Sequence, residues 1–160
     1  MNLRGWAKGF EASAILGGLL VAAATFAGIK NMAVVVAAGS RLSDVSLADL
    51  AKLSKGVQKT WPDGKNFTLV MRHPESPEMH AVTQKLLGAA PGDVKALITK
   101  LNEVRLTVKI VDNDEDLLRT VEATPGAVGI VDVYSINSSV KVLRLDGKLP
   151  FDLGYALKGN

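Results

Sequence analysis

Short apolar runs, rich in β-branched side chains, recur along the chain from residue 32 onward. The first reads Met-Ala-Val-Val-Val-Ala-Ala and contains no polar position. An unbroken apolar run of this length is typical of a strand buried on both faces of a sheet, because both alternating sets of side chains are then apolar. The runs predict five strands, at residues 32–38, 66–71, 106–111, 127–133 and 139–145.

Between the strands, apolar residues recur every three or four positions, which is typical of helices with one buried side. Ser46 and Asp49 have the spacing of a capping box at a helix start. Ser76 followed by Pro77 predicts a second helix, with serine at the N-cap and proline at the first helical position. Further helices are predicted after residues 91–93 and after Asn113 or Asp114, and Gly56 and Gly88 end the first two.

The predicted order β-α-β-α-α-β-α-β-β is typical of an α/β fold, here a three-layer sandwich with a mainly parallel sheet. We expect a single domain over residues 28–160, because the chain is too short for two ordinary ones. Leu50, on the apolar side of the first helix, and Val70, inside the second strand, are predicted core residues. Residues 151–160 carry no clear pattern.

The first 27 residues have the pattern of a secretory signal peptide. Arg4 and Lys8 precede an uncharged run of 18 residues, 12–29, and small residues such as Thr25 and Ala27 follow the apolar centre. We therefore expect cleavage near Ala27 and a periplasmic or otherwise exported protein. An uncleaved membrane anchor is the alternative, and the protein would then touch the membrane only through this segment.

Composition narrows the possible chemistry. The absence of cysteine excludes disulfides and thiolate metal sites, and two histidines cannot form a three-histidine zinc centre. The net charge of +3 comes from scattered basic residues, so no nucleic-acid partner is indicated. We expect no cofactor. The acidic cluster Asp112, Asp114, Glu115 and Asp116 is expected to stabilise a helix start, with a hard-cation site as the alternative.

Four residues near strand ends form a candidate binding site. Ser40 and Arg41 follow the first strand, Arg72 follows the second, and Ser76 begins the next helix. With parallel, right-handed crossovers, Arg41 and Arg72 approach the same edge of the sheet, where ligands of open α/β sheets bind. Guanidinium groups beside a helix N-terminus suit a small oxyanion. The alternative is that both arginines are ordinary solvated loop residues.

Several motifs together resemble a known family. They are the residues 45–50 (Val-Ser-Leu-Ala-Asp-Leu), the turn 61–64 (Trp-Pro-Asp-Gly), Arg72 with Ser76, and the segment 123–130 (Ala-Thr-Pro-Gly-Ala-Val-Gly-Ile). The series resembles the phosphate-type periplasmic substrate-binding proteins of ABC importers, over residues 33–145. The resemblance implies one lobe of a type 2 periplasmic-binding fold, with Arg72 and Ser76 in the positions that contact phosphate in the family.

The chain also departs from the family pattern. A Ser-Gly-Ser/Thr loop usually follows the arginine, whereas residues 73–75 here are His-Pro-Glu. Pro77 lacks a backbone N–H, and Glu75 and Glu78 add negative charge beside the expected anion. Ile130 stands where the family often has tyrosine. A single lobe supplies only half of a closing cleft.

Two hypotheses follow. The first is an exported solute-binding-like protein that recognises phosphate or another small oxyanion through Ser40, Arg41, Arg72 and Ser76, in uptake or sensing. The second is a one-lobe protein–protein interaction module of the cell envelope, without ligand capture. No serine, histidine and acid stand at the spacing of a catalytic triad, so we do not expect an enzyme.

Overall fold

The computed structural model of the chain describes residues 30–158. The predicted signal peptide or anchor at residues 1–27 therefore lies outside the described residues. Among residues 30–158, no helix combines the length and the apolar character needed to cross a membrane.

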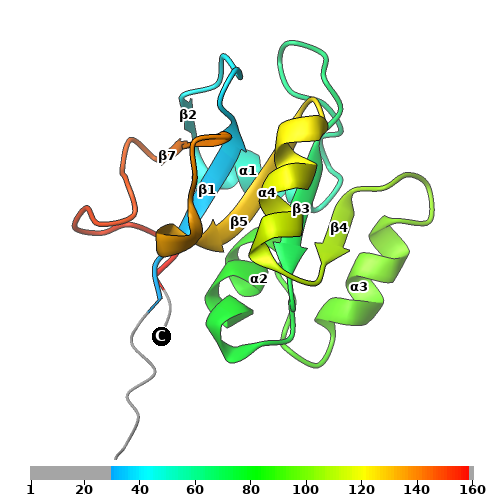
Figure 1. Cartoon of the computed structure of the whole chain (residues 1–160). Coiled ribbons are helices and arrows are strands. Elements are labelled where there is room, and N and C mark those ends of the chain that lie inside the picture. The colour runs from blue at the N-terminus through cyan, green and yellow to red at the C-terminus, as the bar shows by residue number, and fades with distance from the viewer. Residues whose placement is uncertain (1–29, 159–160) are drawn as a thin grey trace, which may run out of the picture.

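A five-stranded sheet with the order β4-β3-β5-β1-β6 forms the centre of the molecule (Figure 1). β3 pairs in parallel with both β4 and β5, whereas β1 pairs antiparallel with β5 and β6. The sheet is thus mainly parallel, as predicted, but its first strand runs against the others. The strands are β1 (Met32–Ala37), β3 (Thr68–Arg72), β4 (Val108–Val111), β5 (Ala127–Asp132) and β6 (Val140–Val142).

A second, two-stranded sheet joins β2 (Asp44–Val45) and β7 (Arg144–Leu145) in parallel. The predicted strand 139–145 is therefore divided between two sheets. Its first part, β6, pairs with β1, and the chain then leaves the main sheet so that the Arg144 N–H donates to the carbonyl of Ser43 at 3.0 Å.

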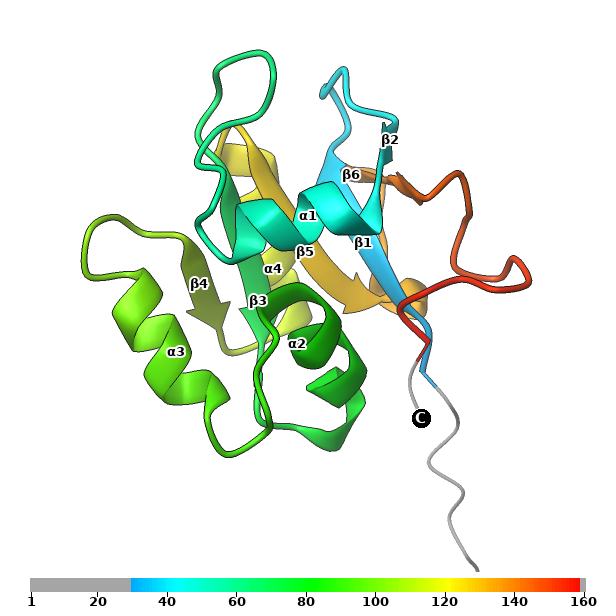
Figure 2. The same ribbon diagram turned by 180° about the vertical axis from the view of Figure 1, so that it is seen from behind.

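Helices cover both faces of the sheet, which confirms the three-layer architecture. The helices α1 (Leu47–Ser54), α2 (His80–Leu87) and α3 (Val94–Leu101) lie on one face, and α4 (Asp114–Ala123) lies on the other (Figures 1 and 2). A 3₁₀ turn, Pro77–Met79, leads directly into α2, and a second one, Val133–Ser135, follows β5.

The two faces of β1 belong to two separate hydrophobic clusters. Val34 and Val36 pack in the cluster beneath α1–α3, and Ala33 and Val35 pack beneath α4. Burial on both faces explains the unbroken apolar run, since each valine side chain taken out of water contributes about 1.5–3 kcal/mol. The predicted core residues Leu50 and Val70 are both fully buried.

The predicted caps of α1 and α4 are confirmed. The Ser46 hydroxyl accepts a hydrogen bond from the Asp49 N–H, and the Asn113 side chain accepts one from the Asp116 N–H. Each cap satisfies a backbone donor that has no partner inside its own helix. Gly88, in the left-handed conformation at φ 66°, ends α2.

The C-terminal segment closes the base of β1, although its sequence carried no clear pattern. Tyr155 and Leu157 are buried, and the Tyr155 hydroxyl donates to the Met32 carbonyl at 2.8 Å. Burial raises the pKa of that hydroxyl. An antiparallel bridge joins Asn31 to Lys158, so both ends of the described chain lie side by side, at the bottom of Figure 1.

Candidate functional site

The predicted arginine Arg72 lies at the end of β3, on the edge where β3, β4 and β5 end, called the carboxyl edge below. Its guanidinium forms an ion pair with Asp114, with 2.7 Å between Nη1 and Oδ1. Its Nε donates to the carbonyl of Asp112 at 3.3 Å. These contacts hold the guanidinium against the loop between β4 and α4, and about one third of the side chain remains exposed.

Asp114, the ion-pair partner of Arg72, was not predicted from the sequence to belong to the binding site. It accepts one hydrogen bond from Arg72 and another from the Ser135 hydroxyl. Partial burial on its own raises the pKa of Asp114, but the hydrogen bonds from Ser135 and Arg72 and the charges of Arg72 and Lys30 together lower it below the usual value. The carboxylate is therefore ionised at neutral pH.

A second ion pair lies on the same edge. Lys30 lies 2.9 Å from the carboxylate of Glu78 and 3.9 Å from that of Asp132. The hydrogen bond and charge of Glu78 raise the pKa of Lys30 above its usual value, with a smaller contribution from Asp132. Two cations, Arg72 and Lys30, thus face three carboxylates, those of Asp114, Glu78 and Asp132. Together these groups do not create a positive field that would attract an anion from a distance.

Ser76 lies at the N-cap position of the turn that leads into α2, but its hydroxyl makes no capping hydrogen bond. The predicted side-chain cap is therefore wrong. The turn is 3₁₀, so the Met79 N–H donates to the Ser76 carbonyl at 2.9 Å and the His80 N–H to the Pro77 carbonyl. Among the described residues, the Ser76 Oγ is buried without any hydrogen-bond partner.

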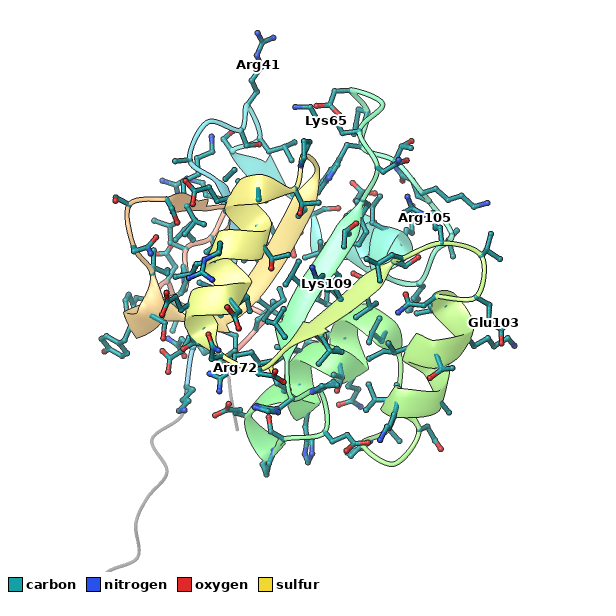
Figure 3. All side chains as sticks on the ribbon, turned by 45° about the vertical axis from the view of Figure 1, so that its right-hand side comes forward. Arg41, Lys65, Arg72, Glu103, Arg105 and Lys109 are labelled. Atoms are coloured by element: carbon teal, nitrogen blue, oxygen red, sulfur yellow. The ribbon has the colours of Figure 1, made fainter. Side chains whose placement is uncertain are left out.

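Ser40 and Arg41 lie at the opposite end of the sheet. Because β1 runs antiparallel to β5, its end lies where β3 and β5 begin, which we call the amino edge. The prediction that Arg41 approaches Arg72 is wrong, since it assumed a parallel first strand; Figure 3 shows the two at opposite ends of the molecule. Arg41 is exposed, and the Ser40 hydroxyl accepts a hydrogen bond from the Leu42 N–H at 3.2 Å.

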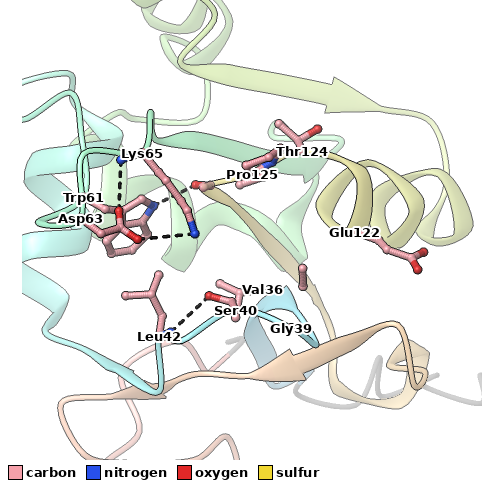
Figure 4. A pocket seen from close by; sticks show the side chains of 13 residues that line it. Val36, Gly39, Ser40, Leu42, Trp61, Asp63, Lys65, Glu122, Thr124 and Pro125 are labelled. Atoms are coloured by element: carbon pink, nitrogen blue, oxygen red, sulfur yellow. Dashed lines mark hydrogen bonds and ion pairs between the residues drawn. The ribbon is translucent and has the colours of Figure 1, made fainter.

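A cavity of about 190 Å³ opens beside Ser40 at the amino edge (Figure 4). Trp61 forms one wall, and its indole N–H donates to the Gly126 carbonyl. Lys65, at the rim, lies 3.6 Å from Asp63. Lys65 is paired with Asp63, and the carboxylates of Asp63 and Glu122 line the cavity, so its charge does not favour an anion.

Three of the four acidic residues in the cluster before and within the first turn of α4 form ion pairs with arginines. Asp114 pairs with Arg72, and Arg119 lies 2.6 Å from Glu115 and 3.4 Å from Asp116. Within residues 30–158, no group of three or more histidine, aspartate or glutamate side chains is arranged to hold a metal ion. The negative charges instead lie at the positive end of a helix dipole, as the sequence indicated.

Comparison with known proteins finds similar solved structures but no match by sequence. No family model matches the sequence, and no curated protein matches it. An ABC-type phosphate transport receptor from Vibrio cholerae superposes with a TM-score of 0.60 at 18% identity, over 76% of this chain and 48% of that one. PstS from Borrelia burgdorferi gives 0.60 at 14% identity, over 82% and 55%. A putative phosphate ABC transporter substrate-binding protein from Clostridium perfringens, solved with bound phosphate, gives 0.53 at 15% identity, over 76% and 47%.

The chain spans about half the length of these proteins. Identities of 14–18% show the fold, and they match the fold that the sequence motifs predicted. The described chain has the α/β fold of one lobe of the phosphate-type periplasmic substrate-binding proteins.

Proposed function

We propose that the chain is an exported, solute-binding-like protein that recognises a small oxyanion, with phosphate as the first candidate, at the carboxyl edge. The observation that carries the proposal is the Ser76 hydroxyl, which is buried without a partner at a helix start four residues after Arg72. An anion oxygen would satisfy this hydroxyl, and the forked guanidinium of Arg72 matches the geometry of a phosphate. The likeness to phosphate-binding proteins supports the choice of ligand.

The carboxylates near Arg72 and Lys30 limit the affinity of the site for an anion. A bound anion must share Arg72 with Asp114 and must lie near the carboxylates of Glu78 and Asp132. Pro77 offers no N–H, and the 3₁₀ turn already uses the donors of Met79 and His80. Charge-assisted hydrogen bonds contribute about 1.5–3 kcal/mol each. Two or three of them supply about 3–9 kcal/mol before these costs are subtracted, so we expect a binding free energy no better than roughly −5 to −6 kcal/mol, a high-micromolar dissociation constant.

Calorimetric titration of phosphate into residues 28–160 tests the proposal. We expect weak, saturable binding that Arg72→Ala abolishes and Ser76→Ala reduces. Arg41→Ala is the matched control, because Arg41 lies at the opposite edge and its loss should leave binding unchanged. Binding that survives Arg72→Ala, in a protein shown to be folded by its thermal transition, would exclude this site.

A specific observation also favours an interaction module of the cell envelope as the second candidate function. Tyr134 and Phe151 are 87% and 66% exposed, and their rings lie 6.2 Å apart. They adjoin the Arg72 site, because Ser135, the neighbour of Tyr134, bonds to Asp114. Immobilised protein should retain an envelope protein that a Tyr134→Ser, Phe151→Ser variant does not. This result together with an absence of phosphate binding would favour the module.

Export is part of the same proposal and rests on residues 1–27 as a signal peptide. Mass spectrometry of the protein from a periplasmic or secreted fraction should show the loss of about 27 residues. An intact N-terminus in the membrane fraction would instead support the anchor. An intact N-terminus in the cytoplasm would contradict both.

A further inference from the structure

A cavity of about 390 Å³ lies where the C-terminal ends of α1 and α3 meet, away from the proposed oxyanion site. Leu101 of α3 packs against Gly56, just after α1. The loop between α3 and β4 forms the third side, and the Arg105 guanidinium fixes it by donating to the Phe67 carbonyl at 2.7 Å. The lining residues are Lys55, Gly56, Lys59, Leu97, Lys100, Leu101, Val104, Arg105 and Thr107.

The charge of this cavity is positive. Four of the lining side chains are cationic and none is a carboxylate. The ion pairs formed within residues 30–158 include none of the four. Lys55 and Lys100 lie at the ends of α1 and α3, where each helix carries about half a negative charge. The two helix ends offset about one of the four positive charges, and the exposed carboxylate of Glu103, on the loop between Lys100 and Arg105, offsets about one more. A net positive charge remains for a ligand.

Exposed aliphatic side chains lie on the loops that line the cationic cavity, and Val104 belongs to the lining itself. Val57 is 75% exposed, Val104 is 85% exposed, and Leu106 is 53% exposed. They come from two loops, the one after α1 and the one before β4, that meet at the cavity. The lining contains no aromatic ring on which a nucleic-acid base could stack. Cations around protruding aliphatic side chains match the chemistry of a lipid interface, with anionic headgroups above acyl chains.

We propose that this surface, made of Lys55, Lys59, Lys100, Arg105, Val57, Val104 and Leu106, docks on a membrane that contains anionic phospholipids. The lysine and arginine side chains bind the phosphate groups of the lipids, and Val57 and Val104 enter the interface. The cavity lies at the amino edge of β3 and β4, with Arg105 far from Arg72 in Figure 3. A protein docked in this way presents the carboxyl edge to the solvent.

Vesicle flotation tests the proposal. The intact protein and its variants are mixed with phosphatidylcholine vesicles that contain either no anionic lipid or about 30 mol% phosphatidylglycerol, which gives the surface a negative potential. The N-terminal segment is the same in every variant, so a difference between variants reports on this surface. Each basic residue near an anionic surface strengthens binding roughly fivefold. We expect Lys59→Glu with Lys100→Glu to weaken binding to the anionic vesicles at least about 25-fold. Val104→Asp, at an exposed position, should weaken it several-fold.

The matched control is Lys85→Glu with Lys95→Glu, which changes the net charge equally at exposed positions outside the surface, and Lys85 contacts the Ala156 carbonyl near the start of β1, at the carboxyl edge. Its binding should stay within about threefold of the unmodified protein, since distant surface charges are largely screened at physiological salt. Equal losses in the two charge-reversed pairs would overturn the proposal, as would equal binding to both kinds of vesicle. Binding unaffected by Val104→Asp but displaced by inorganic tripolyphosphate would also overturn it, in favour of a soluble polyanion.

Discussion

The indole N–H of Trp61 donates to the backbone carbonyl of Gly126, 2.9 Å away, and joins two turns 65 residues apart in the sequence. One turn precedes β3 and the other precedes β5, so the bond fixes the starting points of two neighbouring strands. The Trp61 ring also packs edge-on against Phe67, at 5.6 Å between centroids. Two motifs of the family resemblance, the turn 61–64 and the segment 123–130, are therefore in direct contact.

Trp61→Phe should destabilise the fold through this contact. Phenylalanine keeps an aromatic ring but has no N–H, so the Gly126 carbonyl loses its donor and the smaller ring leaves a gap. We expect the free energy of unfolding to fall by about 1–3 kcal/mol in urea titration. A fall below about 0.5 kcal/mol would show that the hydrogen bond is dispensable.

Gly126→Ala should be far more damaging than Gly64→Ala. Both glycines are left-handed, at φ 80° and 85°, and alanine costs about 1–2 kcal/mol at such a conformation. A methyl group on Gly126 would in addition collide with the backbone carbonyl of Asn66, whereas the space around Gly64 is open. We expect Gly126→Ala to lower the free energy of unfolding by more than about 3 kcal/mol and Gly64→Ala by about 1. Similar midpoints in thermal unfolding would contradict the close approach of the two turns.

Leu50→Ala should lower the free energy of unfolding by about 2–5 kcal/mol, because Leu50 is fully buried between α1 and the sheet. Leu153→Ala is the matched control, since Leu153 is 92% exposed and should change stability by less than about 0.5 kcal/mol. Denaturant titration compares the two. Equal effects would mean that the buried side of α1 has been assigned wrongly.

Asp114 should make stability depend on pH in the acid range. Its pKa in the folded protein lies below the usual value of 3.8, so its stabilising effect is fully present above pH 3.8 and is lost as the pH falls through the folded-state pKa. Asp114→Asn removes the ion pair with Arg72 at every pH. The unfolding free energies of the two proteins should therefore differ at pH 7 and converge on acidification. A difference that stays constant down to pH 2 would contradict the assignment.

Local patterns predicted the main strands and helices, although they missed β2 and the division of residues 139–145 into β6 and β7. The pairing of strands distant in sequence could not be predicted from them. The apolar run of β1 predicts a strand buried on both faces, but such a run is identical for a parallel and an antiparallel neighbour. The direction of β1 depends on its pairing with β5 and β6, about 100 residues later. The predicted site assumed that β1 is parallel to its neighbours, which would bring Arg41 close to Arg72. Because β1 is antiparallel to β5, Ser40 and Arg41 lie at the other edge of the sheet.

The partners of Arg72 could not be predicted from the sequence for the same reason. Asp114 lies 42 residues away, and the sequence pattern explained it fully as an acidic residue at a helix start. The Ser76 cap had a local signal, yet a 3₁₀ start satisfied the backbone donors without its hydroxyl. Nothing in the sequence indicated the cationic cavity, because its four basic residues are spread over residues 55–105 and do not form a run.

The bridge between Asn31 and Lys158 means that the fold does not depend on where in the sequence the described segment starts and ends. Since the two ends lie about one strand spacing apart, roughly 5 Å, a short linker could join them and new ends could be opened at the exposed turn around Gly64. Such a circular permutant would keep all the strand pairings. Neighbouring ends also allow the whole unit to be carried as an insertion within a host protein, whose own chain would leave and return at nearly the same point.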